Sequence, residues 1–299
     1  MKTPVLALTI GLLLAPQVFR SRVDAVRVDA LVTDEHGPIA DLTLADFVLK
    51  DNGVVQALSD AEIRDVPFSL LLALDTSTSV QGDALADLKQ AAHAAVDALR
   101  PDDRVSLLTF TDGVRTRADW NDSRAQVVAA IDATRAGGST SLFDASFAAL
   151  SLRDGDSSRR SLVVLFTDGD DSTSWLPADA VYDRASHTDS VVYAVQLERG
   201  AGGDTRHLFA RSGVTLSGAA PIVRPEPFLP ELARRTGGDL LVARDSRMLR
   251  ETFARIVQQF RTRYLLTYEP KDIGDGWHQI EVTVKRPGAK VTARRGYLR

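Results

Sequence analysis

The sequence predicts an α/β fold with a doubly wound, mostly parallel sheet, joined to a small β-sandwich formed by the N- and C-terminal segments. Nearly continuous apolar strands alternate with amphipathic helices through the middle of the 299-residue chain. Short strands with period-two alternation lie near both ends, and neither group has enough strands to be stable alone. We expect a signal peptide over residues 1–20, sandwich segments over 21–65 and 261–299, and the α/β domain over 66–260.

The central segment contains the strands and helices that predict the parallel sheet. Strands buried on both faces are nearly all apolar, and this pattern occurs at residues 68–74, 105–110, 161–166 and 191–195, with a closing strand at 239–243. Apolar residues at helical spacing indicate helices over 85–99, 123–131, 144–152, 229–235 and 248–260. A stretch rich in Gly and Pro, residues 200–227, is typical of a surface loop.

The terminal segments show the alternation of half-buried strands. Near the N-terminus, strands are expected at residues 26–32, 47–50 and 54–58, with the turn pair Asn52-Gly53 between the last two. Near the C-terminus, Ile280, Val282 and Val284 share one face, and a return strand follows at 291–293. We expect these segments to pair with each other, because chain termini that meet in space allow a domain to be inserted between them.

Composition excludes several classes of protein. The formal net charge of −4 and the pI of about 5.8 argue against a nucleic-acid binder, and no helix combines a Lys/Arg cluster with interleaved aromatics. The absence of Cys excludes disulfides, thiolate metal sites and a Cys nucleophile.

The first residues have the pattern of an export signal. Lys2 precedes an apolar run over residues 5–15, which is too short to span a bilayer but suits the apolar region of a secretory signal peptide. A buried N-terminal helix or strand is the alternative. We therefore expect bacterial export to the periplasm or the medium, with no stable membrane span after cleavage.

Oxygen-bearing side chains gather where ligands bind in open α/β sheets, outside the carboxyl ends of the strands. Asp75, Ser77 and Ser79 follow the first buried strand, Asp168 follows the third, and Thr140 lies in a loop between them. Such oxygen ligands suit a hard cation such as Mg²⁺, and two carboxylates leave room for a further acidic ligand. We expect these residues to hold one cation, which binds an acidic group of a protein or other extracellular partner.

Three motifs in this set resemble the von Willebrand factor type A domain. They are the D-x-S-x-S run from Asp75 to Ser79, the segment Gly-Gly-Ser-Thr-Ser-Leu-Phe-Asp-Ala that contains Thr140, and the strand end Phe-Thr-Asp-Gly that contains Asp168. In that family the five positions form the metal-ion-dependent adhesion site. The resemblance covers about residues 66–259 and implies a non-enzymatic binding module with bound Mg²⁺, or Mn²⁺ or Ca²⁺ in its place.

The resemblance also implies a role for each ligand. Ser77 and Ser79 would bind the metal directly, Asp75 and Asp168 would act partly through water, and Thr140 would engage according to conformational state. The flanks, residues 46–53 and 295–297, resemble a bacterial secreted subgroup, the VWFA-related proteins.

Three further residues belong to the surroundings of the expected site. Asp144 is expected to cap its helix or to orient a ligand, Asp170 to be a solvated loop charge, and Trp175 to offer an aromatic contact surface.

The sequence is also compatible with a simpler interpretation of the motif and with other functions. Asp75, Ser77 and Ser79 could cap the helix that starts near Asp83. A metal-free structural or assembly domain is one functional alternative. An aspartate-based phosphatase is another, although Ser77 stands where its second Asp would be expected.

Overall fold

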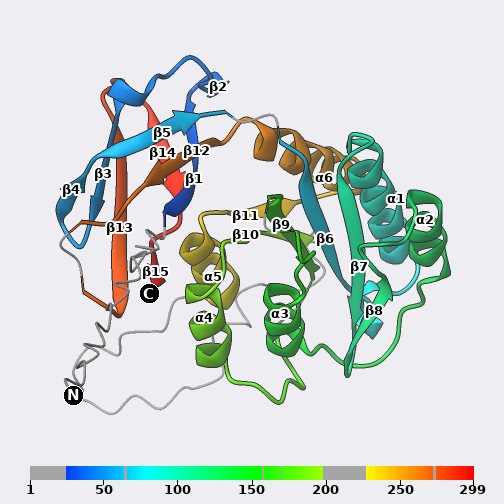
Figure 1. Cartoon of the computed structure of the whole chain (residues 1–299). Coiled ribbons are helices and arrows are strands. Elements are labelled where there is room, and N and C mark those ends of the chain that lie inside the picture. Colours follow the sequence, from blue (N-terminus) through cyan, green and yellow to red (C-terminus); the bar gives the residue numbers. More distant parts are fainter. Residues whose placement is uncertain (1–24, 64–65, 157, 169, 198–226, 272–273) are drawn as a thin grey trace, which may run out of the picture.

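The computed structural model describes residues 25–63, 66–156, 158–168, 170–197, 227–271 and 274–299 (Figure 1). A six-stranded sheet with the order β11-β10-β9-β6-β7-β8 forms the centre. Its strands are β6 (Phe68–Asp75), β7 (Arg104–Phe110), β8 (Val114–Ala118), β9 (Arg160–Thr167), β10 (Val191–Leu197) and β11 (Leu240–Ala243). Neighbours are parallel except for β8, which runs antiparallel to β7. The mostly parallel sheet predicted from the sequence is confirmed.

Helices cover both faces of this sheet (Figure 1). One face packs against α1 (Asp83–Asp97), α2 (Arg124–Ala133) and α6 (Ser246–Arg261). The other face packs against α3 (Leu142–Ser151), α4 (Ala178–Ser186) and α5 (Phe228–Thr236). Because both faces are covered, the central strands can be apolar along their whole length.

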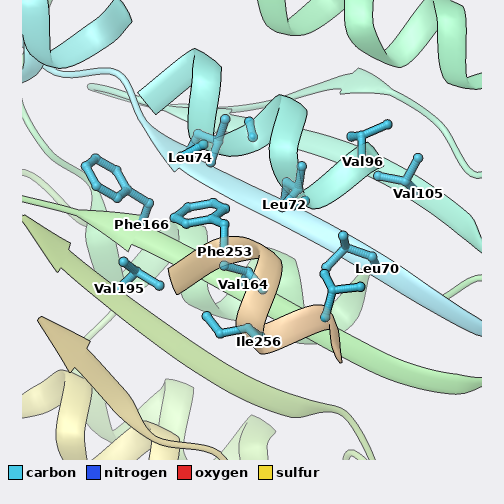
Figure 2. Close-up of a cluster of buried hydrophobic side chains, with 14 of the residues drawn as sticks. Leu70, Leu72, Leu74, Val96, Val105, Val164, Phe166, Val195, Phe253 and Ile256 are labelled. Carbon is cyan, nitrogen blue, oxygen red and sulfur yellow. The ribbon is translucent and has the colours of Figure 1, made fainter. Parts of the chain in front are cut away.

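Strand β6 shows how the two faces divide the core. Leu70, Leu72 and Leu74 belong to the cluster on the α1 side, whereas Leu71 and Ala73 belong to the cluster on the α3 side. This is the period-two alternation of a strand. Figure 2 shows the three leucines lying on the side where α6 packs against the sheet. Full burial of one such side chain contributes about 1.5–3 kcal/mol.

The β-sandwich consists of two antiparallel sheets that draw strands from both ends of the chain. One sheet contains β1 (Val26–Asp34), β2 (Gly37–Pro38), β5 (Leu58–Glu62), β12 (Tyr264–Tyr268) and β14 (Lys290–Ala293). The other contains β3 (Phe47–Asp51), β4 (Val54–Gln56), β13 (Trp277–Val284) and β15 (Gly296–Leu298). Val28, Leu49, Tyr264 and Leu266 lie in the core between them. The predicted sandwich of terminal segments is confirmed.

Several details differ from the expectations. The strand expected over residues 54–58 ends at Gln56 as β4, and Leu58 begins a separate strand, β5. The two are separate because β4 pairs with β3 in one sheet and β5 pairs with β12 in the other. The turn before β4 has φ of 49° at Asn52 and 81° at Gly53, as a tight hairpin requires. Strands β2, β8, β12 and β15 and helix α4 were not predicted. The expected signal peptide and most of the loop at 200–227 lie outside the described residues.

Arg263 joins the sandwich to the central sheet. Its side chain is 0% exposed. One guanidinium nitrogen donates to the hydroxyl of Tyr193 at 3.0 Å, and another donates to the carbonyls of Asp29 at 3.1 Å, Gly237 at 2.5 Å and Thr292 at 3.1 Å. These partners come from β10, β1, the C-terminal end of α5 and β14, so one side chain ties elements of both units together.

Candidate functional site

The candidate ligands lie at the topological switch point of the central sheet, from which successive strands are added outward in opposite directions. Strand β6 lies between β9 and β7, and α1 follows β6 on one face while α4 follows β9 on the other. Leu74 is opposite Phe166, so Asp75 at the end of β6 lies beside Thr167 at the end of β9. The crevice outside such a switch point is the usual ligand site of a doubly wound sheet.

Asp75 is a buried carboxylate held in one orientation. Its Oδ1 accepts a hydrogen bond of 2.8 Å from the backbone N–H of Ser77, and its Oδ2 accepts one of 2.7 Å from the hydroxyl of Thr167. Burial raises the pKa of the Asp75 carboxyl, the two donors lower it in part, and the nearby Asp168 raises it further. A cation would offset both the lost hydration and this repulsion. Sequence reasoning missed Thr167, although it directly precedes Asp168.

The two serines and Asp168 form a continuous chain of oxygens. Ser77 Oγ and Ser79 Oγ are 2.9 Å apart, and the Ser79 hydroxyl donates to Oδ1 of Asp168 at 2.6 Å. Ser77 is buried, Ser79 is exposed and Asp168 is half-buried. The group therefore has a buried floor and one side open to solvent.

Hydrogen bonds bring the loop of Thr140 to the other two loops. The carbonyl of Gly138 accepts from the backbone N–H of Thr78 at 3.0 Å. Thr140 N–H donates to Ser172 Oγ at 3.0 Å, and the Thr140 carbonyl accepts from the N–H of Ser172 at 2.9 Å. The loop after β6 and the loop after β9 thus both form hydrogen bonds with the segment 138–140.

Helix capping does not account for the first motif. Helix α1 begins at Asp83, its N-cap is Gly82, and no side chain caps it. The short 3₁₀-helix η2 (Thr78–Val80) has Ser77 as its N-cap, also without a side-chain hydrogen bond. The positions of Asp75, Ser77 and Ser79 therefore need another explanation.

Asp144 orders the loop that follows Asp168, and the expectation that it caps its own helix is wrong. Its two carboxylate oxygens accept hydrogen bonds from the N–H groups of Trp175 at 3.0 Å and Leu176 at 2.9 Å. The N-terminus of α3 is capped instead from the opposite loop, where Ser174 Oγ accepts from the N–H of Phe143 at 3.0 Å. The Asp144 side chain thus fixes the backbone of residues 175 and 176 in the loop that follows Asp168.

The loop after β9 presents one aromatic and two acidic side chains. Trp175 is 92% exposed although its backbone is fixed. Asp170 is exposed, whereas Asp171 is half-buried and accepts from the N–H of Phe143 at 3.2 Å. Asp171 is therefore an acceptor that holds the loop against the start of α3.

The donor set fits a hard divalent cation. Among the described residues there is no group of three or more His, Cys, Asp and Glu that could hold a metal. A softer transition metal would prefer the nitrogen and sulfur ligands of His and Cys. Two carboxylates and three hydroxyls instead match the oxygen preference and the few protein carboxylates of Mg²⁺ sites, which keep several waters.

Comparison with known proteins identifies a family match within the central segment. Residues 70–170 match the profile of the von Willebrand factor type A domain family. An uncharacterised protein of Synechocystis is 31% identical over 119 residues, which are 39% of this chain and 28% of that protein. The chain therefore spans less than a third of the length of this curated relative.

Solved structures show the same fold. A von Willebrand factor type A protein from Catenulispora acidiphila has a TM-score of 0.52 at 15% identity, over 93% of this chain and 74% of that one. An aerotolerance-related membrane protein from Bacteroides fragilis has a TM-score of 0.50 at 16% identity, over 64% of this chain and 98% of that one. Residues 70–170 therefore contain a von Willebrand factor type A domain, and the central sheet has the fold of that domain.

Proposed function

We propose that the protein is a metal-dependent binding module in which Asp75, Ser77, Ser79, Thr140 and Asp168 hold Mg²⁺, and in which an acidic group of a protein or other extracellular partner completes the site. The observation that carries the proposal is the convergence of three loops at the switch point, with the Ser79–Asp168 side open to solvent. Type A domains in general are interaction modules, which agrees with binding rather than catalysis.

Each residue has a distinct task in this proposal. Asp75, fixed by Ser77 N–H and Thr167 hydroxyl, supplies negative charge at the buried floor. Ser77 and Ser79 supply neutral oxygens, which keep the formal charge of the protein ligands at only −2. When bound, the cation supplies positive charge and a free coordination position for a carboxylate oxygen.

A related structure supports the choice of a metal site. Proximal thread matrix protein 1 of the mussel byssus has been solved with zinc in its metal-ion-dependent adhesion site, and it shares the fold with a TM-score of 0.50 at 16% identity, over 65% of this chain and 48% of that one. For this chain we propose Mg²⁺, with Mn²⁺ or Ca²⁺ as substitutes, because all the candidate ligands are hard oxygens.

Thermodynamic linkage tests whether an acidic partner binds the metal. Affinity for Mn²⁺ is measured by calorimetry with and without hexaglutamate, a probe that offers carboxylates. An acidic ligand that binds the metal must tighten Mn²⁺ by the same factor by which Mn²⁺ tightens it. We expect this coupling in the wild type and in Asp170→Asn, and its loss in Asp168→Asn. Asp170 is the matched control because it is an exposed carboxylate of the same loop. Equal Mn²⁺ affinity with and without the probe contradicts the proposal.

The same proteins separate binding from the other two functions. A phosphatase that used Asp75 as its nucleophile would hydrolyse a phosphate ester such as p-nitrophenyl phosphate and would lose this activity in Asp75→Ala. We expect no hydrolysis that depends on Asp75. A metal-free assembly domain would show no saturable metal binding by the folded wild type.

Export is the cellular setting that we propose for this function. Lys2 and the apolar run at residues 5–15 support a signal peptide. Within the parts of the chain that the structure describes, no helix is long and apolar enough to cross a membrane. The mass of the mature protein from a bacterial periplasm tests the proposal, since removal of about 20 residues is expected and an intact N-terminus would contradict it.

A further inference from the structure

A polar cavity of about 230 Å³ lies beside the candidate metal site. Its walls come from the ends of β6 and β7, from β8 and from the segment that follows α2. Three arginines, Arg115, Arg117 and Arg135, line it together with the hydroxyl-bearing residues Thr76 and Thr109. The cavity thus combines strong hydrogen-bond donors with a high local positive charge.

The three guanidinium groups have no carboxylate partner in the described part of the chain. Within the described ranges, the one hydrogen bond that these groups form runs from Nε of Arg117 to the hydroxyl of Thr109, at 2.9 Å. All three side chains are exposed. In a protein with a net charge of −4 and 40 Asp and Glu residues, three arginines that share a cavity without an acidic partner are a feature to be explained.

Protection of the sheet edge explains only part of this arrangement. Arg115 and Arg117 lie on β8, the edge strand of the central sheet, and charged side chains there discourage pairing with another chain. Arg135 comes from a different element, the segment after α2, and still lines the same cavity. Because arginines from two separate elements converge on one cavity, the arrangement favours a site that binds an anion.

The cavity and the candidate metal site share one wall. Thr76, which lines the cavity, stands between Asp75 and Ser77 in the chain. Its carbonyl accepts from the N–H of Gly137 at 2.8 Å, and Gly137 also lines the cavity. The next residues, 138–140, lead to Thr140. An extended peptide advances about 3.3–3.6 Å per residue, so a few residues of one partner can reach neighbouring sites.

We propose that this cavity, lined by Arg115, Arg117 and Arg135, is a second anion-binding site for the same partner, and that the partner segment is an acidic peptide with at least two acidic side chains. One carboxylate occupies the arginine cavity and another completes the metal site; this second contact rests on the proposed function. Guanidinium groups match carboxylates in geometry, and the volume of about 230 Å³ suits a single acidic side chain.

The test measures fluorescein-labelled hexaglutamate by anisotropy, once in EDTA and once in Mg²⁺. The double variant Arg115→Gln/Arg135→Gln is compared with Arg255→Gln/Lys290→Gln, which removes two exposed positive charges elsewhere. We expect the first variant to weaken binding about tenfold in both buffers, because charge-assisted hydrogen bonds are lost. The control variant should bind as the wild type does. Circular dichroism and urea unfolding establish that both variants are folded.

The outcomes separate this inference from the proposed function. Equal weakening by the two double variants overturns the cavity as a site, since only net charge would then matter. Binding of a sulfated polysaccharide without binding of hexaglutamate overturns the acidic peptide as ligand. Binding in EDTA tests the cavity alone, because no metal is present. If Mg²⁺ does not change the affinity of the wild type for hexaglutamate, the result counts against the metal site.

Discussion

The hydroxyl of Ser79 donates a 2.6 Å hydrogen bond to Oδ1 of Asp168 and thereby joins two loops that are 89 residues apart in the chain. Both residues lie on the open side of the site, above the buried Asp75 and Ser77. The contact brings one hydroxyl oxygen and one carboxylate oxygen of the proposed site together. Under the proposed function, the hydroxyl proton of Ser79 would turn away from Asp168 when a cation binds.

Removal of the Ser79 hydroxyl should weaken metal binding without unfolding the protein. We expect Ser79→Ala to lower Mg²⁺ affinity by at least about tenfold, because the loss of a ligand exceeds the effect of most outer contacts. Stability should change by less than about 0.5 kcal/mol, since the side chain is exposed. Ser139→Ala, an exposed serine next to Thr140, is the control for calorimetry. Equal Mg²⁺ affinities of the two variants would show that Ser79 is not a metal ligand.

Asp144 should affect stability more than metal chemistry. Asp144→Ala leaves the N–H groups of Trp175 and Leu176 without their acceptor, and the expected loss is about 1–3 kcal/mol in urea unfolding. Asp144→Asn retains one acceptor oxygen and should lose less. Metal binding should persist in both folded variants. Complete loss of Mg²⁺ binding in Asp144→Asn would instead identify Asp144 as a direct ligand.

Trp175 should report binding of the partner. The side chain is 92% exposed in the loop that follows Asp168, and exposed aromatic residues are enriched in contact surfaces. We expect hexaglutamate with Mg²⁺ to shift the tryptophan emission of the wild type. The shift should vanish in Trp175→Phe and persist in Trp277→Phe, whose indole is 44% exposed on the sandwich. A shift retained by Trp175→Phe would place the contact elsewhere.

Arg263 should matter strongly for the stability of the whole chain. Arg263→Ala removes the donor to the carbonyl of Gly237 and the hydroxyl of Tyr193, which are buried, and to two part-buried carbonyls. Each buried group left unsatisfied costs about 1–3 kcal/mol. We expect a loss of at least about 3 kcal/mol in urea unfolding. Arg255→Ala, on the exposed face of α6, should cost less than about 0.5 kcal/mol. Equal free energies of unfolding of the two variants would show that the hydrogen bonds of Arg263 contribute little to stability.

Local patterns were sufficient to predict the parallel sheet. The apolar run of β6, buried at every position, is recognisable without its neighbours because strands covered on both faces lack polar alternation. The D-x-S-x-S motif after it predicted the loop that holds Asp75, Ser77 and Ser79 at the edge of the sheet. Both signals depend only on residues close together in the chain.

Contacts between distant segments could not be predicted in this way. Thr167 binds Asp75 across 92 residues, and nothing near either residue indicates the pairing. Strand β12 follows α6 after two residues, and its short apolar run could equally continue the helix. The assignment of β4 and β5 to different sheets likewise depends on partners elsewhere in the chain.

Metal binding by the folded protein tests the central claim most directly. Mg²⁺ and Mn²⁺ are titrated calorimetrically into the wild type, Asp75→Ala and Asp168→Asn, with circular dichroism of each protein. We predict saturable binding to the wild type with a Kd of roughly 10⁻⁴ to 10⁻³ M, in the range of extracellular divalent sites. Binding should be absent from folded Asp75→Ala and strongly reduced in Asp168→Asn. A folded wild type that binds neither ion, or an Asp75→Ala variant that binds as well as the wild type, would contradict the account.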